Sequence, residues 1–313
     1  MGLIKKPIYE IALDGKKLSD KLHSAAQKIE LNDEAGIESD SLSIDFAGNL
    51  PHIDAGRKLA VKLGYEGEAL ISFGFYSIES TAWSIEKMSV SATGLNFAGV
   101  MKQKRTQTYE GLSVKEIVEL IAARNDHDGL PKCDFDEIRI PYLAQTDESD
   151  MHFLRRLAKE YDALFSVKSG RIIFIKRGTE TDGKDVPIYE LNASDLSDLT
   201  ITRKARPKYN SVQALWREND ETKSVVVGSG EPIFKLNSPF LNAQVAYLKA
   251  ESKFARLRRD CFEGSFSCAG ANIRAGGRLT LIGAGENSGD YEITKVTQSV
   301  SKSGWITSAK LGG

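Results

Sequence analysis

Two blocks of sequence occur twice in the same order, and this repetition restricts the possible folds more than any other feature of the chain. The segment 54–64 resembles the segment 274–283, since both contain Ala-Gly, a basic residue and then alternating apolar positions before a Gly, one of them with an extra residue. Further along, 74–81 resembles 289–296. Alternating apolar residues are typical of half-buried strands. The repeat therefore predicts two related β structures in the chain.

Short segments with strand character, separated by turn residues, occupy most of the first hundred residues and the last hundred. We expect strands at 8–13, 27–31, 42–46, 57–63, 69–80, 85–92, 211–216 and 223–227, and four more between Phe262 and Lys310. This spacing of short strands is typical of small antiparallel barrels or sandwiches.

Helix signals are concentrated in the middle of the chain. Ser113 and Glu116 have the spacing of a capping box, which predicts a helix that ends before residue 125. The stretch 145–175 predicts a second helix, with Ser149 as its N-cap and Asp150 in its first turn, followed by a tight hairpin. Its apolar residues recur at steps of three and four and so share one face: Phe153, Leu154, Leu157, Ala158 and Tyr161.

These patterns together predict a mainly β protein with α+β elaborations. We expect two related small antiparallel β-barrel domains, at 1–104 and 201–313, flanking an α+β middle domain at 105–200. A long helix near 242–260 would be inserted in the second barrel domain. Its basic residues predict a basic surface: Lys249, Lys253, Arg256, Arg258 and Arg259.

Composition places the chain among soluble globular proteins. Its 313 residues are 41% apolar and 27% charged, and the net charge of −1 does not favour a surface built for nucleic acid. Three widely spaced cysteines, at Cys133, Cys261 and Cys268, predict free thiols in a reducing cytoplasm. No apolar run approaches the length of a membrane helix, so we expect no membrane anchor.

Opposite charges gather in separate parts of the sequence. Seven acids and no Lys or Arg lie between Ile29 and Gly56. A run of cations follows the first 200 residues: Arg203, Lys204, Arg206 and Lys208. Each cluster fits a solvated strand edge. Alternatively, the acidic stretch 30–54 meets the basic run, or the helix 249–259 with Arg256, Arg258 and Arg259, on a neighbouring subunit.

Residues with the pattern of a catalytic, cofactor or metal site do not stand out. The four histidines lack partners at ligand spacing, and no nucleophile elbow, phosphate loop or zinc-protease motif is present. The polar cluster at 125–129 lacks the spacing of a calcium loop. Glu148 and Asp150 could form a glycosidase pair, but their position at a helix start explains them without catalysis. We therefore expect no catalytic, cofactor-binding or metal-binding residue.

The stretch 145–158 resembles the signature of the phage late control gene D family, the baseplate hub proteins of contractile-tailed phages and tailocins. The residues that carry this resemblance are Gln145, Glu148, Ser149, Asp150, Phe153, Leu154, Arg156, Leu157 and Ala158. The segments GLSVKEIVELIAA, GRKLAVKLGY and FYSIEST also resemble that family, so the similarity covers nearly the whole chain.

The resemblance implies a structural protein of the virion tail baseplate, assembled in the bacterial host cytoplasm and encoded by a phage or prophage. It implies the fold of the hub portion of type VI secretion VgrG proteins and a homotrimer that joins the hexameric tail tube protein to the trimeric central spike protein, among other baseplate proteins. Spike and lysozyme-like activities would belong to partners. Two other readings remain: a carbohydrate- or nucleic-acid-binding β-barrel protein, and a cell-wall hydrolase.

Overall fold

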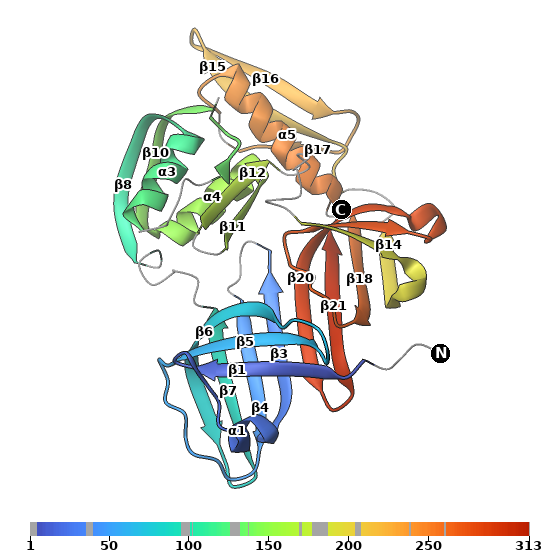
Figure 1. The fold of residues 1–313 in the computed structure, drawn as a ribbon. Helices are drawn as coiled ribbons and strands as arrows, with labels where there is room; N and C mark the ends of the chain where they lie inside the picture. The colour runs from blue at the N-terminus through green and yellow to red at the C-terminus, as the bar shows by residue number, and fades with distance from the viewer. Residues whose placement is uncertain are drawn as a thin grey trace. The chain divides into compact units, whose positions relative to one another are not determined.

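Two compact units make up the chain. The computed structural model describes residues 5–35, 40–94, 101, 103–125, 132–136, 138–168, 171–176, 187–203, 208–237, 239–259 and 261–312. One unit consists of Met1–Asn96, Val186–Thr200 and Ser265–Leu311, and the other consists of Phe97–Asp185, Ile201–Gly264 and Gly312–Gly313 (Figure 1). Each unit is built around its own apolar core.

The first unit is formed by strands from both ends of the chain. Its N-terminal elements are β1 (Pro7–Leu13), β2 (Lys16–Lys17), α1 (Asp20–Ala25), β3 (Ala26–Glu34), β4 (Ser41–Ala47), β5 (Lys58–Tyr65), β6 (Ile71–Trp83) and β7 (Lys87–Gly94). The later elements are β13 (Ile188–Asn192), η1 (Ala193–Asp195), β14 (Ser197–Arg203), β18 (Phe262–Ala269), β19 (Arg278–Ile282), η2 (Gly285–Asn287), β20 (Gly289–Ser301) and β21 (Gly304–Gly312), of which β14 and β18 run across the boundary between the units.

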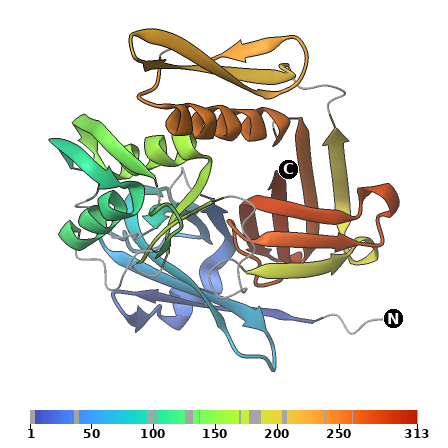
Figure 2. The same ribbon diagram turned by 90° about the horizontal axis from the view of Figure 1, so that it is seen from above.

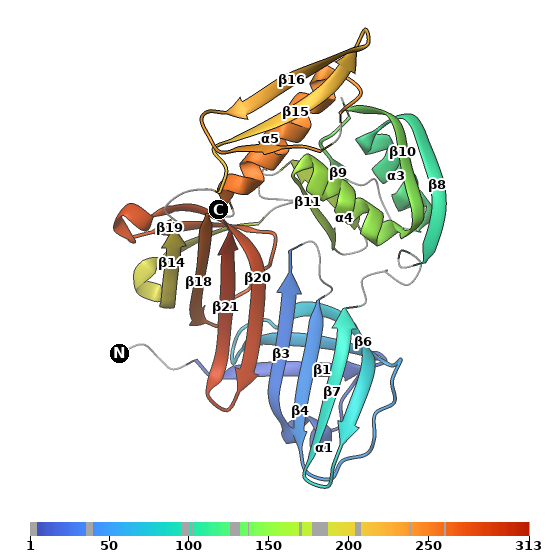
Figure 3. The same ribbon diagram turned by 180° about the vertical axis from the view of Figure 1, so that it is seen from behind.

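These strands share one sheet whose order contains the same pattern twice. The order is β14-β18-β21-β20-β3-β4-β7-β6-β5-β1-β2, and β19 pairs with β20 while β13 pairs with β19 (Figure 3). The first half therefore runs β3-β4-β7-β6-β5, and the second runs β14-β18-β21-β20-β19. The halves join where β3 pairs antiparallel with β20, from Lys28 with Ser301 to Glu34 with Lys295.

Two backbone hydrogen bonds occur at matching positions in the two halves. The N–H of Gly56 donates to Ile78 O over 2.8 Å, and the N–H of Gly276 donates to Ile293 O over 2.7 Å. The N–H of Ile78 donates to Arg57 O and that of Ile293 to Gly277 O, each over 2.9 Å. Arg57 therefore matches Gly277, and the extra residue that the sequence comparison placed here is not needed.

The core of the first unit follows from the alternation of its strands. Inward positions of β4 and β5 are buried: Leu42, Ile44, Phe46, Leu59, Val61 and Leu63. Full burial of such a side chain stabilises the fold by about 1.5–3 kcal/mol. Trp305 of β21 also belongs to this core, and its ring lies 5.1 Å from that of Tyr65.

The second unit combines helices with three small sheets. Its elements are β8 (Lys104–Ser113), α3 (Val114–Arg124), β9 (Lys132–Cys133), β10 (Arg139–Ser149), α4 (Asp150–Tyr161), β11 (Ala163–Lys168), β12 (Arg171–Lys176), β15 (Ser211–Glu218), β16 (Glu221–Gly228), β17 (Ile233–Lys235) and α5 (Ala243–Arg259). The sheets are β8 with β10, β9 with β11 and β12, and β15 with β16 and β17. Helices α3 and α4 bury one apolar face each, against β12 and β11 among other strands.

Helix α5 lies along the sheet of β15 and β16, where Figure 2 shows it in orange beside the gold strands. Ala246 and Ala250 are its buried residues, and they pack with Val212 and Ala214 of β15. The Asn242 side chain accepts a hydrogen bond from the N–H of Val245 over 2.9 Å, which satisfies one free donor of the first turn.

The structure confirms a mainly β fold with a large antiparallel sheet, and it confirms most predicted elements. The capping box of Ser113 and Glu116 is present, as are the four strands after residue 261 and the hairpin of β11 and β12. Strands β8 and β10 were not predicted from the sequence, because many of their residues are exposed and the buried positions do not alternate cleanly. The three-segment domain division stays a prediction.

Gly56 and Gly276 offer a test of the duplication. Both have positive φ, +83° and +79°, in the turn before a matched strand. Alanine in this region is strained, so Gly56→Ala and Gly276→Ala should each lower the free energy of unfolding by about 1 kcal/mol. Asparagine tolerates the conformation better and should cost less at both sites. Chemical denaturation measures both; clearly different costs at the two positions would contradict the match.

Candidate functional site

The signature stretch 145–158 forms the end of β10 and most of α4. Ser149 has the extended backbone of an N-cap, with φ −74° and ψ 154°, and its Oγ accepts a hydrogen bond from the N–H of His152 over 3.2 Å. Asp150 follows in the first turn. The predicted cap is therefore confirmed, and so is the buried face, because the structure buries Phe153, Leu154, Leu157, Ala158 and Tyr161.

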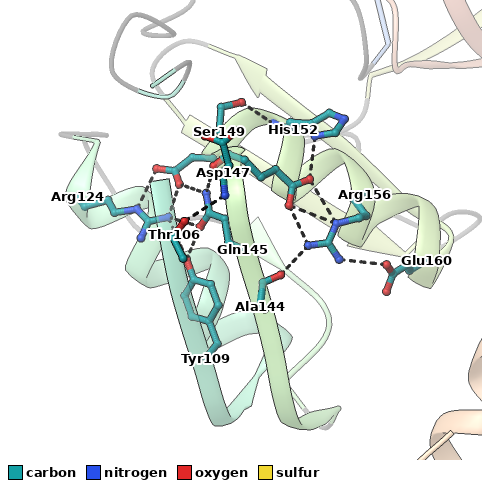
Figure 4. Close-up of polar contacts among 12 residues, drawn as sticks. Thr106, Tyr109, Arg124, Ala144, Gln145, Asp147, Ser149, His152, Arg156 and Glu160 are labelled. Atoms are coloured by element: carbon teal, nitrogen blue, oxygen red, sulfur yellow. Dashed lines mark hydrogen bonds and ion pairs between the residues drawn. The ribbon is translucent and has the colours of Figure 1, made fainter. Parts of the chain in front are cut away.

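An irregularity in β10 turns the signature residues toward the helix. The register of β10 against β8 shifts between Gln145 and Glu148, and Asp147 has a positive φ of 45°. The N–H of Asp147 donates to Thr106 Oγ1 of β8 over 3.1 Å, which ties the bulge to the neighbouring strand (Figure 4). Such a bulge redirects side chains.

Asp150 is the centre of a buried polar cluster. Its side chain is fully buried. Its carboxylate accepts hydrogen bonds from Arg124 Nε over 2.9 Å, Asn125 Nδ2 over 2.9 Å and Gln145 Nε2 over 2.8 Å. Arg124 Nη2 also donates to Oδ1 of Asp150, and Arg105 Nε lies 3.4 Å from the same oxygen. The charge is thus both paired and hydrogen-bonded, as a buried carboxylate requires.

Gln145 and Tyr109 complete this cluster. Gln145 Oε1 accepts from Tyr109 Oη over 3.0 Å and from Arg124 Nη2 over 3.1 Å, while its Nε2 also donates to Glu148 O over 2.8 Å. Tyr109 Oη in turn accepts from Arg124 Nη2 over 2.9 Å. Every donor and acceptor of the Gln145 amide has a partner, so the cluster fixes one side-chain arrangement.

Electrostatics favour the ionised form of Asp150. Burial raises the pKa of its carboxyl, but hydrogen bonds from Arg124, Gln145 and Asn125 and the charge of Arg124 outweigh burial, so the pKa lies below its usual value. The dipole of α4 acts in the same direction, because Asp150 is in the first turn of that helix.

Glu148 organises a second group of charges on the outer side of α4. It accepts from Arg156 Nη2 over 2.9 Å and lies 2.8 Å from His152 Nδ1. Arg156 Nη2 also donates to Ala144 O over 3.0 Å, and Arg156 Nη1 donates to Glu160 over 3.4 Å (Figure 4). The pair of Glu148 and Arg156 therefore ties the helix to the strand before it.

Two further ion pairs fasten α5 to the end of α4. Lys249 Nζ donates to Glu160 over 2.7 Å and lies 3.6 Å from the ring centroid of Tyr161. Arg259 pairs with Asp162, the left-handed residue that ends α4. The prediction that Lys249 contributes to a basic surface is wrong, because its side chain is only 11% exposed.

This arrangement is suited to holding structure and not to chemistry. Asp150 is inaccessible, and Glu148 is occupied by Arg156 and His152. In the described part of the chain, no group of three or more His, Cys, Asp or Glu could hold a metal ion, and no helix is long and apolar enough to cross a membrane. Of the polar cluster at 125–129, only Asn125 is among the described residues.

The candidate interface charges lie in different environments in the structure. Lys204 and Arg206 lie outside the described residues, Arg203 and Lys208 are exposed, Arg256 is half-buried, Arg258 is exposed and Arg259 pairs with Asp162. Within the acidic stretch, Glu30 pairs with Lys28, Glu34 with Lys295 and Asp45 with Lys87. Their role between subunits stays a prediction.

Sequence reasoning missed Arg124, Tyr109, Asn125 and Arg105. Arg124 and Asp150 are 26 positions apart, and only the pairing of β8 with β10 and the packing of α3 bring them together. The available signal was weak: a cation at the end of one predicted helix and an acid at the start of the next, which is favourable for each helix separately.

Asp150→Asn should destabilise the protein strongly. The substitution leaves the half-buried cation of Arg124 without its counter-ion, and removal of one partner from a buried pair costs about 3 kcal/mol or more. Asp147→Asn is the matched control, since Asp147 is exposed and its ion pair with Lys104 is at the surface, where a loss costs less than about 1 kcal/mol. Urea unfolding measures both; equal losses would contradict a structural role for the cluster.

The lowered pKa of Asp150 predicts a dependence of stability on pH. Because the folded pKa lies below the unfolded value of about 3.9, this carboxylate's contribution is complete above that value and disappears as the pH falls through the folded pKa. The stability difference between the wild type and Asp150→Asn should therefore shrink below about pH 4. Unfolding curves from pH 6 downward test this; a difference that stays constant would refute it.

Comparisons with known proteins show relatives that match nearly the whole chain. The chain is 24% identical over 367 residues to the "Probable baseplate hub protein" of Escherichia phage P2, covering 99% of this chain and 94% of that protein. Its fold resembles a 43 kDa tail protein of prophage MuSo2 from Shewanella oneidensis, with a TM-score of 0.72, 12% identity and coverage of 97% and 98%. It also resembles the Escherichia coli c3393 protein, described as a type VI secretion component, with a TM-score of 0.61, 13% identity and coverage of 96% and 76%.

A family model describes most of the chain. The model for the phage tail baseplate hub (GPD) matches residues 97–304, which include the α4 signature and four strands of the second half of the sheet, β14, β18, β19 and β20. The resemblance indicated by residues 145–158 is thereby confirmed, together with a structural and not enzymatic role and a place in the tail baseplate, among other tail components. The chain belongs to the phage tail baseplate hub (GPD) family.

Proposed function

We propose that this hub protein acts as a homotrimer that joins a hexameric tail tube to a trimeric central spike in the baseplate of a contractile tail. The observation that carries the proposal is the duplicated order of strands, β3-β4-β7-β6-β5 and β14-β18-β21-β20-β19. Three copies would supply six similar halves. Such a ring could bind a partner with threefold symmetry through one contact per chain. It could bind a partner with sixfold symmetry through one contact per half.

The joint between β3 and β20 provides a model for the joint between copies. Besides the backbone ladder, Thr297 Oγ1 donates to Asn32 Oδ1 over 2.8 Å, and Lys295 pairs with Glu34. This joint connects β3 of the first half with β20 of the second. If copies connect in the same manner, β14 must take the place of β3, and β6 must take the place of β20.

Strand β14 corresponds to β3 by its neighbour and its pattern. It borders β18 as β3 borders β4, and Ser197 Oγ donates to Ser267 O over 3.2 Å. Its half-buried residues Leu199 and Ile201 alternate with exposed ones, as the buried Ile29 and Leu31 alternate in β3. Among the described strands, β14 pairs only with β18 and stands at the end of the sheet.

Strand β6 corresponds to β20. Both are 13 residues long and form hydrogen bonds with the matched strands β5 and β19 through their first halves. Beyond this pairing, β20 binds β3. The equivalent residues of β6, Ser80–Trp83, pair only with β7 among the described strands. Strand β14 of a second copy can add at this edge, which gives a head-to-tail contact.

The finer fold prediction belongs to the same proposal. Each half would form one of the two related small antiparallel barrels, and the second compact unit would contain the α+β elaborations. The matched hydrogen bonds of Gly56 and Gly276 support the relation between the halves. In this arrangement the Asp150 cluster keeps the signature helix rigid while the baseplate transmits force.

Solution mass and particle shape test the proposal. We expect native mass spectrometry to give three times the chain mass of 34.4 kDa, and negative-stain images to give a ring with a sixfold outline. A monomer with an exposed aromatic groove would favour a carbohydrate-binding barrel instead.

Cysteine cross-linking tests the strand joint itself. Thr297 pairs with Asn32 in the chain, and the matching residues between copies are Ala82 and Thr202. A mixture of Ala82→Cys and Thr202→Cys chains should form an intermolecular disulfide, because paired strand residues lie within disulfide reach. Ala82→Cys with Asp198→Cys, four positions along β14, is the control. Equal cross-linking of both pairs would contradict the proposed joint.

A further inference from the structure

The joint between the halves has a charged corner where β3 meets the loop before β19. Asp33 Oδ2 of β3 accepts a hydrogen bond from the N–H of Ala275 over 3.0 Å. The preceding residue, Arg274, donates from Nη2 to Ser72 O over 2.6 Å, and its guanidinium lies 4.0 Å from the ring centroid of Phe73. Within the chain, the strand therefore contributes an acid at this corner and the loop contributes a cation.

The corresponding corner between copies has its own residues. The loop before β5 matches the loop before β19 through Gly56 and Gly276, so Asp54 takes the place of Arg274. On the strand side, Ile201 takes the place of Leu31. Arg203, two residues further, then takes the place of Asp33, which is two residues beyond Leu31. Arg203 and Asp54 are both exposed.

From this match we propose that Arg203 of one copy forms an ion pair with Asp54 of the next copy at the joint of β14 with β6. The inference rests on the proposed ring and identifies a specificity contact within it. The charges at this corner are reversed relative to the joint inside the chain. Inside the chain the strand carries the acid, whereas between copies the strand carries the cation. An arginine side chain is long enough to reach from the strand to the loop, as the shorter Asp33 reaches the backbone N–H of Ala275.

The reversed charges prevent the strand of one joint from binding at the other joint. If β14 displaced β3 from β20, Arg203 would meet the cation Arg274. If β3 added to β6, Asp33 would meet the anion Asp54. Like charges placed together at an interface are unfavourable, so each incorrect pairing is penalised while each correct one is favoured. Two joints with similar backbones thus remain distinct, which prevents strand exchange between copies.

Charge reversal tests this contact. Arg203→Glu and Asp54→Arg should each raise the concentration needed for assembly about tenfold or more, because each places like charges together. The double variant Arg203→Glu with Asp54→Arg should restore assembly to near the wild-type concentration. Arg217→Glu and Glu110→Arg are matched controls, since both residues are exposed on strands of the second unit and should leave assembly unchanged. Sedimentation velocity measures assembly, and circular dichroism checks that each variant folds.

The possible outcomes test the ion pair and the proposed trimer separately. A wild-type ring whose single reversals assemble as the controls do would overturn the ion pair and leave the proposed trimer intact. The absence of rescue in a folded double variant would also overturn it. A wild-type chain that stays monomeric at its highest soluble concentration would overturn both proposals together.

Discussion

The antiparallel ladder between β3 and β20 is the contact on which the first unit depends. It joins residues separated by up to 273 positions, Lys28 and Ser301, and it turns two similar half-sheets into one. A long-range pairing of this kind must overcome a large loop entropy before it contributes, so we expect it to form late in folding. The N-terminal strands therefore remain incomplete until the last fifty residues have been made.

The second unit is stabilised by its apolar core and, in addition, by buried polar contacts. Its elements are short, and its three sheets have two or three strands each, so strand pairing alone gives little stability. The buried charges around Asp150 and the ion pairs of Glu160 and Asp162 instead connect α3, α4, α5 and the β8–β10 ribbon. Such contacts are directional, so they select one arrangement among many that an apolar core would accept. A baseplate hub needs this selectivity, because its neighbours must meet it in a fixed geometry.

Features that depend on neighbouring residues could be predicted from the sequence, whereas pairing between distant residues could not. The caps at Ser113 and Ser149, the buried face of α4 and the alternating strands depend on residues within a few positions of each other. The duplication was visible because Ala-Gly and Gly-x-Tyr-x-Ile recur, although one extra residue was wrongly introduced. By contrast, β8 is mostly exposed and has no clear period. The burial of Lys249 depends on Glu160, 89 positions away, which no local pattern reports.

The reuse of one joint has a geometric consequence. If the contact between copies repeats the contact between halves, the angle between the halves at the β20–β3 joint determines the number of subunits in the ring. An angle of one sixth of a turn closes the ring after three chains, while a slightly different angle produces an open filament that never closes. Residues that set the twist of this ladder, such as Thr297 and Asn32, would then determine the number of subunits without touching a subunit boundary.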